Sequence, residues 1–335
     1  MSVSIAALGE HALIARLRQR VGPTPPHVQI GIGDDAAVMA PERGAVDVLT
    51  TDCLVEGVHF RRDWTALSAV GHKALAVSLS DLAAMGATPR ASLLSLVLPD
   101  SLPVDDFDAL VDGYVALATA SGAALIGGNM TRSPGPVVVD VTAVGSVRRR
   151  RVMRRDTALA GDELYVTGQV GAAAAGLAML TAAVPRHAMN DAALGCVARY
   201  ERPDARVRCG TSVGRTGAAS AAMDLSDGLA AAARGIAEAS GLGVTIDAAA
   251  VPLHEGARSW AEQAGIDPVT FALAGGEDYE IAFAVRPRQR RKFLAACRRS
   301  AGLAVTRIGR FTAEPGAWLD RSGRTEPVPT GFNHF

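Results

Sequence analysis

Five short segments of the chain combine glycine with carboxylates or hydroxyls, and each of them follows an apolar run. They are residues 31–35 (GIGDD), 50–52 (TTD), 78–81 (SLSD), 224–228 (DLSDG) and 275–278 (GGED). Carboxylate and hydroxyl oxygens are the ligands that Mg²⁺ prefers, and the ion keeps water and substrate phosphates as its other ligands. Glycine beside them lets the backbone approach phosphate oxygens closely. Together the five segments predict a site for Mg²⁺ and phosphate.

Each segment also has an ordinary structural interpretation. Asp-Gly and Gly-Asp pairs are typical of turns, and an aspartate before a helix is typical of an N-cap. That interpretation weakens when five such segments occur in one chain without matching cations nearby. Acids gathered in a buried cleft repel one another unless they bind a metal.

Periodicity and turn residues predict the elements that must position these segments. In the first half we expect helices over residues 12–21, 67–85 and 104–120, and strands over 46–51, 91–98, 123–126 and 137–143. In the second half we expect helices over residues 168–180, 227–240 and 289–301, and strands over 163–167, 244–247, 279–285 and 304–309. The elements mix without a strict βαβ rhythm, so the predicted fold class is α+β.

Length and composition limit the class of protein. A chain of 335 residues is longer than one typical core, and the arginine-rich run at 148–155 is its sharpest break in composition, which predicts domains over 1–150 and 151–335. A formal net charge of zero disfavours a nucleic-acid binder. The sequence shows no signal-peptide pattern and no apolar run long enough to cross a membrane, and its four cysteines are scattered. These features predict a cytoplasmic protein that binds neither nucleic acid nor membrane.

In wording and order, the segments resemble the thiamine-monophosphate kinase family, within the superfamily of aminoimidazole ribonucleotide synthetase-like ATP-dependent enzymes. The matching text is GIGDDAAV, TTDCLVEGVHF, KALAVSLSDLAAMGA, LIGGN, GDELYVTG, DLSDGL, SGLGVTID, GGEDYE and the terminal GFNHF. It runs from residue 31 to 335 and so covers nearly the whole chain. The resemblance implies a kinase that uses ATP and several Mg²⁺ ions to phosphorylate thiamine monophosphate.

The same resemblance implies a fold and a set of site residues. The N-terminal domains would pair into a shared β-barrel across a homodimer, and the C-terminal domain would complete the ATP and substrate site. The implied metal ligands are Asp35, Thr50, Thr51, Asp52, Asp81, Asp224, Asp227 and Asn129. The implied ATP contacts are Gly128, Asn129, Arg155 and Ser226, and the implied substrate contacts are His59, Glu277 and Phe332.

Some of these residues have plain alternatives when they are considered alone. His59 is then an ordinary turn histidine, and Phe332 is an unremarkable C-terminal core residue. Within the arginine-rich run, residues 148–151 are interpreted as a solvated connection between domains, and only Arg155 matches the family's ATP-contacting position. A guanidinium there suits bidentate contact with a phosphate.

One position departs from the family pattern. The family commonly has GGD where this chain has Gly127, Gly128 and Asn129, and that aspartate is a metal ligand. Asparagine keeps a carbonyl oxygen, which still coordinates Mg²⁺, but it loses the negative charge. We therefore expect weaker binding at one of several ions, with a catalytically impaired relative as the alternative.

The implied reaction needs no general base. The acceptor is a phosphate monoester whose second pKa is about 6, so it is largely dianionic at neutral pH. The sequence shows no Ser-His-Asp, Cys-His or kinase-type catalytic loop signature, and no Walker A motif. Several Mg²⁺ ions would screen repulsion between the phosphates and align a direct in-line transfer.

Two other functions compete with this one. One is a sister enzyme of the same superfamily that makes aminoimidazole ribonucleotide, selenophosphate or a hydrogenase-maturation intermediate. Sister enzymes that handle selenium or thiocarbamate use a cysteine in a mobile terminal segment, and the terminal GFNHF has none. The other is a non-catalytic binder of metal or nucleotide, which only Asn129 favours.

Overall fold

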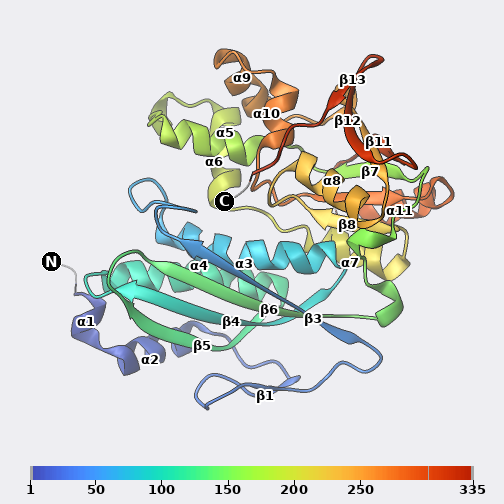
Figure 1. The fold of residues 1–335 in the computed structure, drawn as a ribbon. Helices are drawn as coiled ribbons and strands as arrows, with labels where there is room; N and C mark the ends of the chain where they lie inside the picture. Colours follow the sequence, from blue (N-terminus) through green and yellow to red (C-terminus); the bar gives the residue numbers. More distant parts are fainter. Residues whose placement is uncertain (1–2, 301, 333–335) are drawn as a thin grey trace. The chain divides into compact units, whose positions relative to one another are not determined.

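The computed structural model describes residues 3–300 and 302–332, and it divides the chain into two compact units. The first unit contains residues 1–82 and 88–149, and the second contains residues 83–87 and 150–335 (Figure 1). Each unit mixes helices with a largely antiparallel sheet, which confirms the mixed helix-and-sheet class. Among the described residues, no helix combines the length and the apolarity that crossing a membrane requires.

The first unit contains a four-stranded sheet in the order β3-β6-β4-β5, in which only β4 and β5 are parallel. The strands of this sheet are β3 (Val46–Val55), β4 (Thr88–Pro99), β5 (Ala124–Ser133) and β6 (Val138–Val147), and β1 (Val28–Ile30) and β2 (Val38–Met39) form a separate two-stranded sheet. The helices of this unit are α1 (Ile5–Leu8), α2 (Glu10–Arg20), α3 (Leu67–Ala84, whose end lies in the second unit) and α4 (Val104–Ser121).

Helices α3 and α4 cover one face of this sheet (Figure 1). Val139, Val141 and Ala143 of β6 are fully buried, so the alternation over residues 137–143 marks the covered face. The two helices pack closely at two glycines. A Cβ on Gly71 would lie 1.9 Å from the Leu110 carbonyl oxygen, and a Cβ on Gly113 would lie 1.9 Å from that of Ser68.

One strand of the first unit differs from the expectation. The strand expected over residues 123–126 continues through Gly127, Gly128 and Asn129, and β5 ends only at Ser133. The reason is close packing, because a Cβ on Gly128 would lie 1.9 Å from the Leu94 carbonyl oxygen of β4. The glycine pair therefore allows two strands to approach instead of ending one of them.

The second unit contains a seven-stranded sheet in the order β13-β12-β9-β11-β7-β10-β8. Its strands are β7 (Glu163–Thr167), β8 (Ala221–Asp224), β9 (Gly243–Asp247), β10 (Ile281–Val285), β11 (Val305–Thr312), β12 (Gly316–Arg321) and β13 (Arg324–Pro327). Its helices are α5 (Ala172–Thr181), α6 (Asp191–Glu201), α7 (Val207–Thr216), α8 (Leu229–Ala239), α9 (Glu255–Gln263), α10 (Pro268–Ala274) and α11 (Arg290–Cys297).

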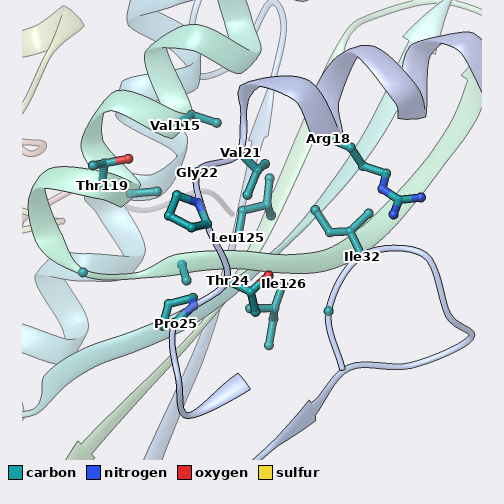
Figure 2. A pocket seen from close by; sticks show the side chains of 15 residues that line it. Arg18, Val21, Gly22, Thr24, Pro25, Ile32, Val115, Thr119, Leu125 and Ile126 are labelled. Carbon is teal, nitrogen blue, oxygen red and sulfur yellow. The ribbon is translucent and has the colours of Figure 1, made fainter. Parts of the chain in front are cut away.

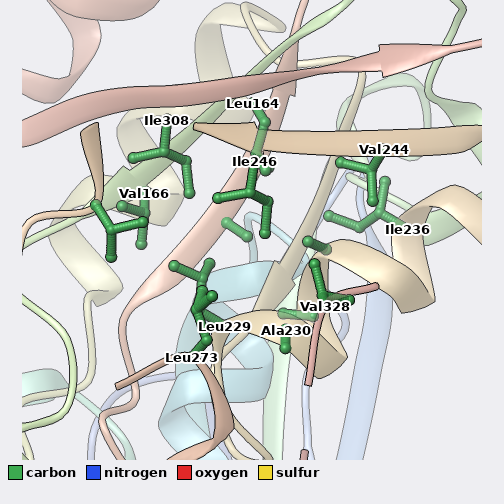
Figure 3. Close-up of a cluster of buried hydrophobic side chains, with 14 of the residues drawn as sticks. Leu164, Val166, Leu229, Ala230, Ile236, Val244, Ile246, Leu273, Ile308 and Val328 are labelled. Atoms are coloured by element: carbon green, nitrogen blue, oxygen red, sulfur yellow. The ribbon is translucent and has the colours of Figure 1, made fainter. Parts of the chain in front are cut away.

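Both faces of the central strands are buried. Leu164, Val166 and Ile246 pack against Leu229 and Ile236 of α8 on one face, as Figure 3 shows. On the other face, a second cluster joins strand residues to α7 and α11, with Tyr165, Ile281, Phe283, Val213 and Phe293 among its members. A strand that is buried on both faces has a nearly continuous apolar sequence, which explains the composition of β7 and β10.

Several boundaries in the second unit also differ. The helix expected from residue 168 begins at Ala172, because Gly171 has a left-handed backbone (φ 87°). The strand expected from residue 279 begins at Ile281, because Tyr279 has a φ of 50°. The helix expected over 289–301 ends at Cys297, and residue 301 lies outside the described residues. Helices α6, α7, α9 and α10 and strands β8, β12 and β13 were not predicted.

Candidate active site

In the first unit, strand β3 and helix α3 bring three of the predicted metal ligands together. The Ser78 hydroxyl donates to the Asp52 carboxylate at 2.8 Å, and the Thr50 hydroxyl donates to the Asp81 carboxylate. Positions 50 and 52 share one face of the strand, and positions 78 and 81 share one face of the helix. Two hydroxyl–carboxylate pairs therefore lie side by side, and Ser78 joins the three residues that the sequence singled out.

The charge in this cluster is unbalanced. Burial, together with the negative charges of Asp81 and Asp140, raises the pKa of Asp52 to about 6, against the opposing hydrogen bond from Ser78. A cation at this point would relieve that cost. In the described part of the chain, no three His, Cys, Asp or Glu side chains form a metal site by themselves. Mg²⁺ commonly uses one or two carboxylates with substrate phosphates and waters, so an all-oxygen pair of this kind fits it.

Thr51 lies on the opposite face of the sheet from Thr50 and Asp52. Its hydroxyl is 3.5 Å from the Asp140 carboxylate and 3.3 Å from the Thr142 hydroxyl, both on β6. The structure therefore separates Thr51 from the cluster beside α3. Asp140 was missed, although the alternation that buries residues 137, 139, 141 and 143 places residues 140 and 142 together on the other face.

A groove of about 730 Å³ runs along that other face of the sheet. Residues 31–37, which contain the GIGDD segment, form one side of it. Asp35, Gly128 and Asn129 line the groove, and Asp140 lines it as well. The first unit thus holds its predicted metal ligands in two groups, one beside α3 and one in this groove.

The loop that carries the GIGDD segment packs against helix α2. A Cβ on Gly33 would lie 3.1 Å from the Arg18 guanidinium, and Gly33 itself has a φ of 124°. Arg18 also borders a mainly apolar pocket of about 460 Å³, formed by the loop after α2, by α4 and by β5 (Figure 2). None of the predicted site residues lines that pocket, but Gly31 and Ile32 of the GIGDD segment border both the pocket and the groove.

His59 lies on a tight loop just after β3 and is half-buried. Its Nδ1 accepts a hydrogen bond from the Val55 backbone N–H at 3.1 Å, and the buried Lys73 ammonium donates to its carbonyl oxygen at 3.3 Å. With Nδ1 occupied as an acceptor, a neutral imidazole carries its proton on Nε2. The loop therefore presents a fixed donor.

In the second unit, three segments hold one another by backbone hydrogen bonds, and we call them the second-unit clasp. They are residues 224–228 after β8, residues 275–280 before β10 and residues 331–332 near the C-terminus. The Glu277 N–H donates to the Ser226 carbonyl at 2.7 Å, and the Phe332 N–H donates to the Asp227 carbonyl at 3.1 Å. The clasp brings together five predicted residues, namely Asp224, Ser226, Asp227, Glu277 and Phe332.

The residues of the clasp differ in exposure. Asp224 is buried at the end of β8, whereas the Phe332 side chain is 55% exposed, so it is not a core residue. Residues 333–335 of the GFNHF segment lie outside the described residues. Glu277 is half-buried and has a left-handed backbone with a φ of 65°.

Arg155 is not brought to the clasp. It is exposed in a short 3₁₀ helix, η2 (Arg155–Thr157), and the adjacent Arg154 pairs with Ala221 at the start of β8. Ser226 follows the other end of that strand, which is about 10 Å away for a strand of this length. Of the predicted ATP contacts in the second unit, only Ser226 lies in the clasp.

Two further acids of the GGEDYE segment have internal partners. Asp278 accepts backbone hydrogen bonds from Gly171 and Ala173 at the start of α5. Glu280 is fully buried, pairs with Arg199 and Arg206, and accepts from the Thr167 hydroxyl at 2.6 Å. The acids of this segment therefore divide into Glu277, which lies at the surface of the clasp, and two buried acids that hold the fold.

Each of the two units matches a known domain family. Residues 33–147 match the AIR synthase related protein, N-terminal domain, and residues 160–319 match the AIR synthase related protein, C-terminal domain. The chain is 38% identical to the thiamine-monophosphate kinase of Salmonella typhimurium, over 98% of this chain and 99% of that protein. It is 32% identical to that of Rhodopirellula baltica, over 97% of each chain.

Solved structures of thiamine-monophosphate kinases also resemble this chain. The thiamine-monophosphate kinase from Stenotrophomonas maltophilia matches with a TM-score of 0.83 and 38% identity, over 96% of this chain and 98% of that one. AaThiL complexed with AMPPCP and TMP matches with a TM-score of 0.78 and 32% identity, over the full length of both chains. The hydrogenase maturation protein HypE shares the fold, with a TM-score of 0.78, at only 19% identity. The chain therefore belongs to the thiamine-monophosphate kinase family.

Proposed function

We propose that this protein transfers the γ-phosphoryl group of ATP to thiamine monophosphate, giving thiamine diphosphate and ADP. The observation that carries the proposal is the match with thiamine-monophosphate kinases over nearly the whole length of both chains. AaThiL, which binds AMPPCP and TMP together, matches the chain in full. The acids, hydroxyls and glycines of both units supply the residue types that this reaction needs.

We assign recognition of thiamine monophosphate to His59, Glu277 and Phe332. Thiamine carries a permanently cationic thiazolium ring, and a cation is attracted by an aromatic face and by a carboxylate. Phe332 presents a largely exposed ring on the clasp, and Glu277 supplies the charge. His59 in the first unit would contact the acceptor phosphate or the pyrimidine.

We assign ATP binding to Gly128, Asn129, Ser226 and Arg155. Gly128 and Asn129 line the groove of the first unit. The Ser226 carbonyl accepts from the Glu277 N–H, which fixes the loop from which the Ser226 hydroxyl would reach a phosphate. Arg155 has an exposed guanidinium, which suits bidentate contact with phosphate oxygens. In this proposal residues 1–150 bind metal and ATP, and residues 151–335 complete the site.

The oxygen donors of both units fit Mg²⁺, which prefers carboxylate, carbonyl, hydroxyl and water oxygens. The residues that would hold several ions are Asp35, Asn129, Thr50, Thr51, Asp52, Asp81, Asp224 and Asp227. When bound, the ions neutralise charge between the phosphates. Ser78 and Thr50 hold the carboxylates of Asp52 and Asp81 in fixed positions before any ion arrives.

The bond changes balance without an acid or base from the chain. One oxygen of the acceptor phosphate forms a bond to the γ-phosphorus of ATP, and the bond from that phosphorus to the bridging oxygen breaks, releasing ADP. The acceptor phosphate, with a second pKa of about 6, is already largely ionised at neutral pH. The residues of the site therefore bind, orient and exclude water, and no covalent nucleophile is required.

The open face of the first unit's sheet supports a homodimer with a shared β-barrel. Leu49 of the edge strand β3 is 66% exposed and Leu93 of the inner strand β4 is 37% exposed, so this face presents apolar side chains to solvent. We expect Leu49→Glu to shift the protein toward monomer in analytical ultracentrifugation, with Val58→Glu, an exposed loop residue, as the control. Wild-type protein that sediments as a monomer would contradict the dimer. We place the enzyme in the cytoplasm, where ATP is available.

The direct test uses purified protein with ATP, Mg²⁺ and thiamine monophosphate, and follows thiamine diphosphate and ADP by chromatography. We expect stoichiometric formation of both. Asp52→Ala should abolish it, whereas Asp47→Ala, on the same strand but on its other face, should leave the rate near that of the wild type. No thiamine diphosphate under conditions in which ATP binds would refute the kinase.

The chain's departure at Asn129 has its own test. Asn129 lines the groove where the family carries an aspartate. We expect Asn129→Asp to lower the Mg²⁺ concentration needed for half-maximal rate, because the variant restores one negative charge. If wild-type protein binds ATP without turnover and Asn129→Asp restores it, the non-catalytic relative is the correct description.

A further inference from the structure

The turn over residues 275–280 has an uncommon backbone. Glu277 (φ 65°) and Tyr279 (φ 50°) both have left-handed conformations although neither is glycine, and Asp278 stands between them. Such conformations persist only where the surroundings hold them, and they gather at functional sites. The question is which contacts hold this turn in place.

One side of the turn is held by the loop after β8. The Glu277 N–H donates to the Ser226 carbonyl at 2.7 Å, the Tyr279 N–H donates to the Leu225 carbonyl at 3.2 Å, and the Leu225 N–H donates to the Glu280 carbonyl at 2.9 Å. These bonds fix the turn against the loop. Leu225 and Glu280 are fully buried, whereas Ser226 and Glu277 are half-buried. At its Glu277 end, this side of the turn therefore meets the more exposed part of the loop.

The other side of the turn is held by Asp278. Its side chain is 1% exposed and accepts from the Gly171 N–H at 2.6 Å and from the Ala173 N–H at 3.0 Å. These amides belong to the first turn of α5, where a helix favours an anion. The carboxylate therefore fills the place that a substrate phosphate would take at a free helix N-terminus, and α5 is not a phosphate site.

We infer that Asp278 is a positioning residue for substrate binding, which holds Glu277 in its left-handed conformation by tying the turn to the start of α5. Asp278 does not touch the substrate, and it acts through Glu277. The inference rests on the proposed role of Glu277 in binding thiamine monophosphate. Glu280, two residues further on, has a different task, since its partners Arg199 and Arg206 keep it within the core.

The test is a double-mutant cycle between Asp278→Asn and Glu277→Gln, with steady-state kinetics for both substrates. We expect Asp278→Asn to lower kcat/KM for thiamine monophosphate about tenfold to a hundredfold, as small displacements of positioned groups do, with the KM for ATP changed less than about twofold. In the Glu277→Gln background, Asp278→Asn should lower kcat/KM for thiamine monophosphate by less than about a further twofold. The reason is that Asp278 acts through the Glu277 carboxylate, which that background already lacks.

Asp247→Asn is the matched control. Asp247 caps the 3₁₀ helix η4 (Ala248–Ala250) by accepting from the Ala249 N–H at 3.0 Å, in the same unit but outside the clasp. It should alter neither kinetic constant. Independent, additive effects of the two site variants, or equal losses for both substrates in folded Asp278→Asn protein, would overturn the inference.

A second measurement on the wild-type protein covers the case in which Asp278→Asn does not fold. Hydrogen exchange of the peptide that contains Gly171 and Ala173 should slow when thiamine monophosphate binds, because fixing Glu277 also fixes its anchor. Unchanged exchange at saturating substrate contradicts the inference. Wild-type protein that neither binds nor phosphorylates thiamine monophosphate refutes the proposed function itself, whereas active wild-type protein with an additive cycle refutes only the role of Asp278.

Discussion

The two units hold their chemical groups in different ways. In the first unit, side chains position side chains, since the hydroxyls of Thr50 and Ser78 fix the carboxylates of Asp81 and Asp52 between a helix and a strand. In the second unit, backbone positions backbone, and the clasp is joined by main-chain hydrogen bonds with Asp278 as an internal anchor. Activity should therefore be sensitive to the loss of a single polar atom in the first unit. In the clasp it should be sensitive to any atom added where two backbone segments pass closely.

The largest effect is expected where the turn over residues 275–280 passes close to the loop after β8. A Cβ on Gly276 would lie 2.6 Å from the Ser226 carbonyl oxygen, so Gly276→Ala must push the turn away from the loop. We expect kcat/KM for thiamine monophosphate to fall about a hundredfold. Gly195→Ala in α6, where the added carbon meets only ordinary contacts at 3.6 Å, is the control. Equal activity of Gly276→Ala and wild type would show that the clasp is more tolerant than we infer.

A smaller effect is expected from one polar atom in the first unit. Ser78→Ala removes the hydrogen bond to Asp52 and leaves the carboxylate in place. Residues that orient metal ligands typically contribute about 10–100-fold in metal affinity or activity, so the Mg²⁺ requirement should rise toward that range. Ser121→Ala, which removes only bonds to the Leu117 and Ala118 carbonyls within α4, should change nothing. If Ser78→Ala needs no more Mg²⁺ than the wild type for half-maximal rate, the first unit is not sensitive to the loss of this polar atom.

The third effect concerns stability against pH and leaves the metal ligands untouched. Burial raises the pKa of Asp278 from 3.8 to about 7, with Glu280 adding to the shift and the two backbone N–H groups and Arg199 opposing it. A raised pKa favours the folded state at low pH, so this contribution is complete below about pH 4 and is lost as the pH rises through 7. Asp278→Asn lacks it. Urea unfolding should therefore show the difference between wild type and variant falling by roughly 1 kcal/mol per pH unit across this window.

Parallel stability curves for the two proteins would contradict that assignment. The buried Asp52, whose pKa is also raised, is present in both and cancels in the difference.

The sequence predicted the family, the reaction and many of the helices and strands, because a long Ala/Leu-rich run without Gly or Pro after Gly71, such as residues 67–84, indicates a helix by itself. It did not predict which face of β3 each hydroxyl occupies, because apolar and polar residue types do not alternate over residues 46–55, although their burial does. Nor did it separate the acids of GGEDYE. Asp278 meets amides more than a hundred residues earlier in the chain, and no local pattern records a contact of that range.

The reciprocal glycines between α3 and α4 have a consequence for the site that neither of them touches. Gly71 and Gly113 set the depth at which α3 sits, and α3 presents Ser78 and Asp81 to β3. A methyl group at either position would lift the helix and stretch both hydroxyl–carboxylate pairs together. The absence of a side chain at these two glycines therefore sets the positions of the metal-binding acids. A saturation screen should find these two positions nearly as invariant as the acids themselves.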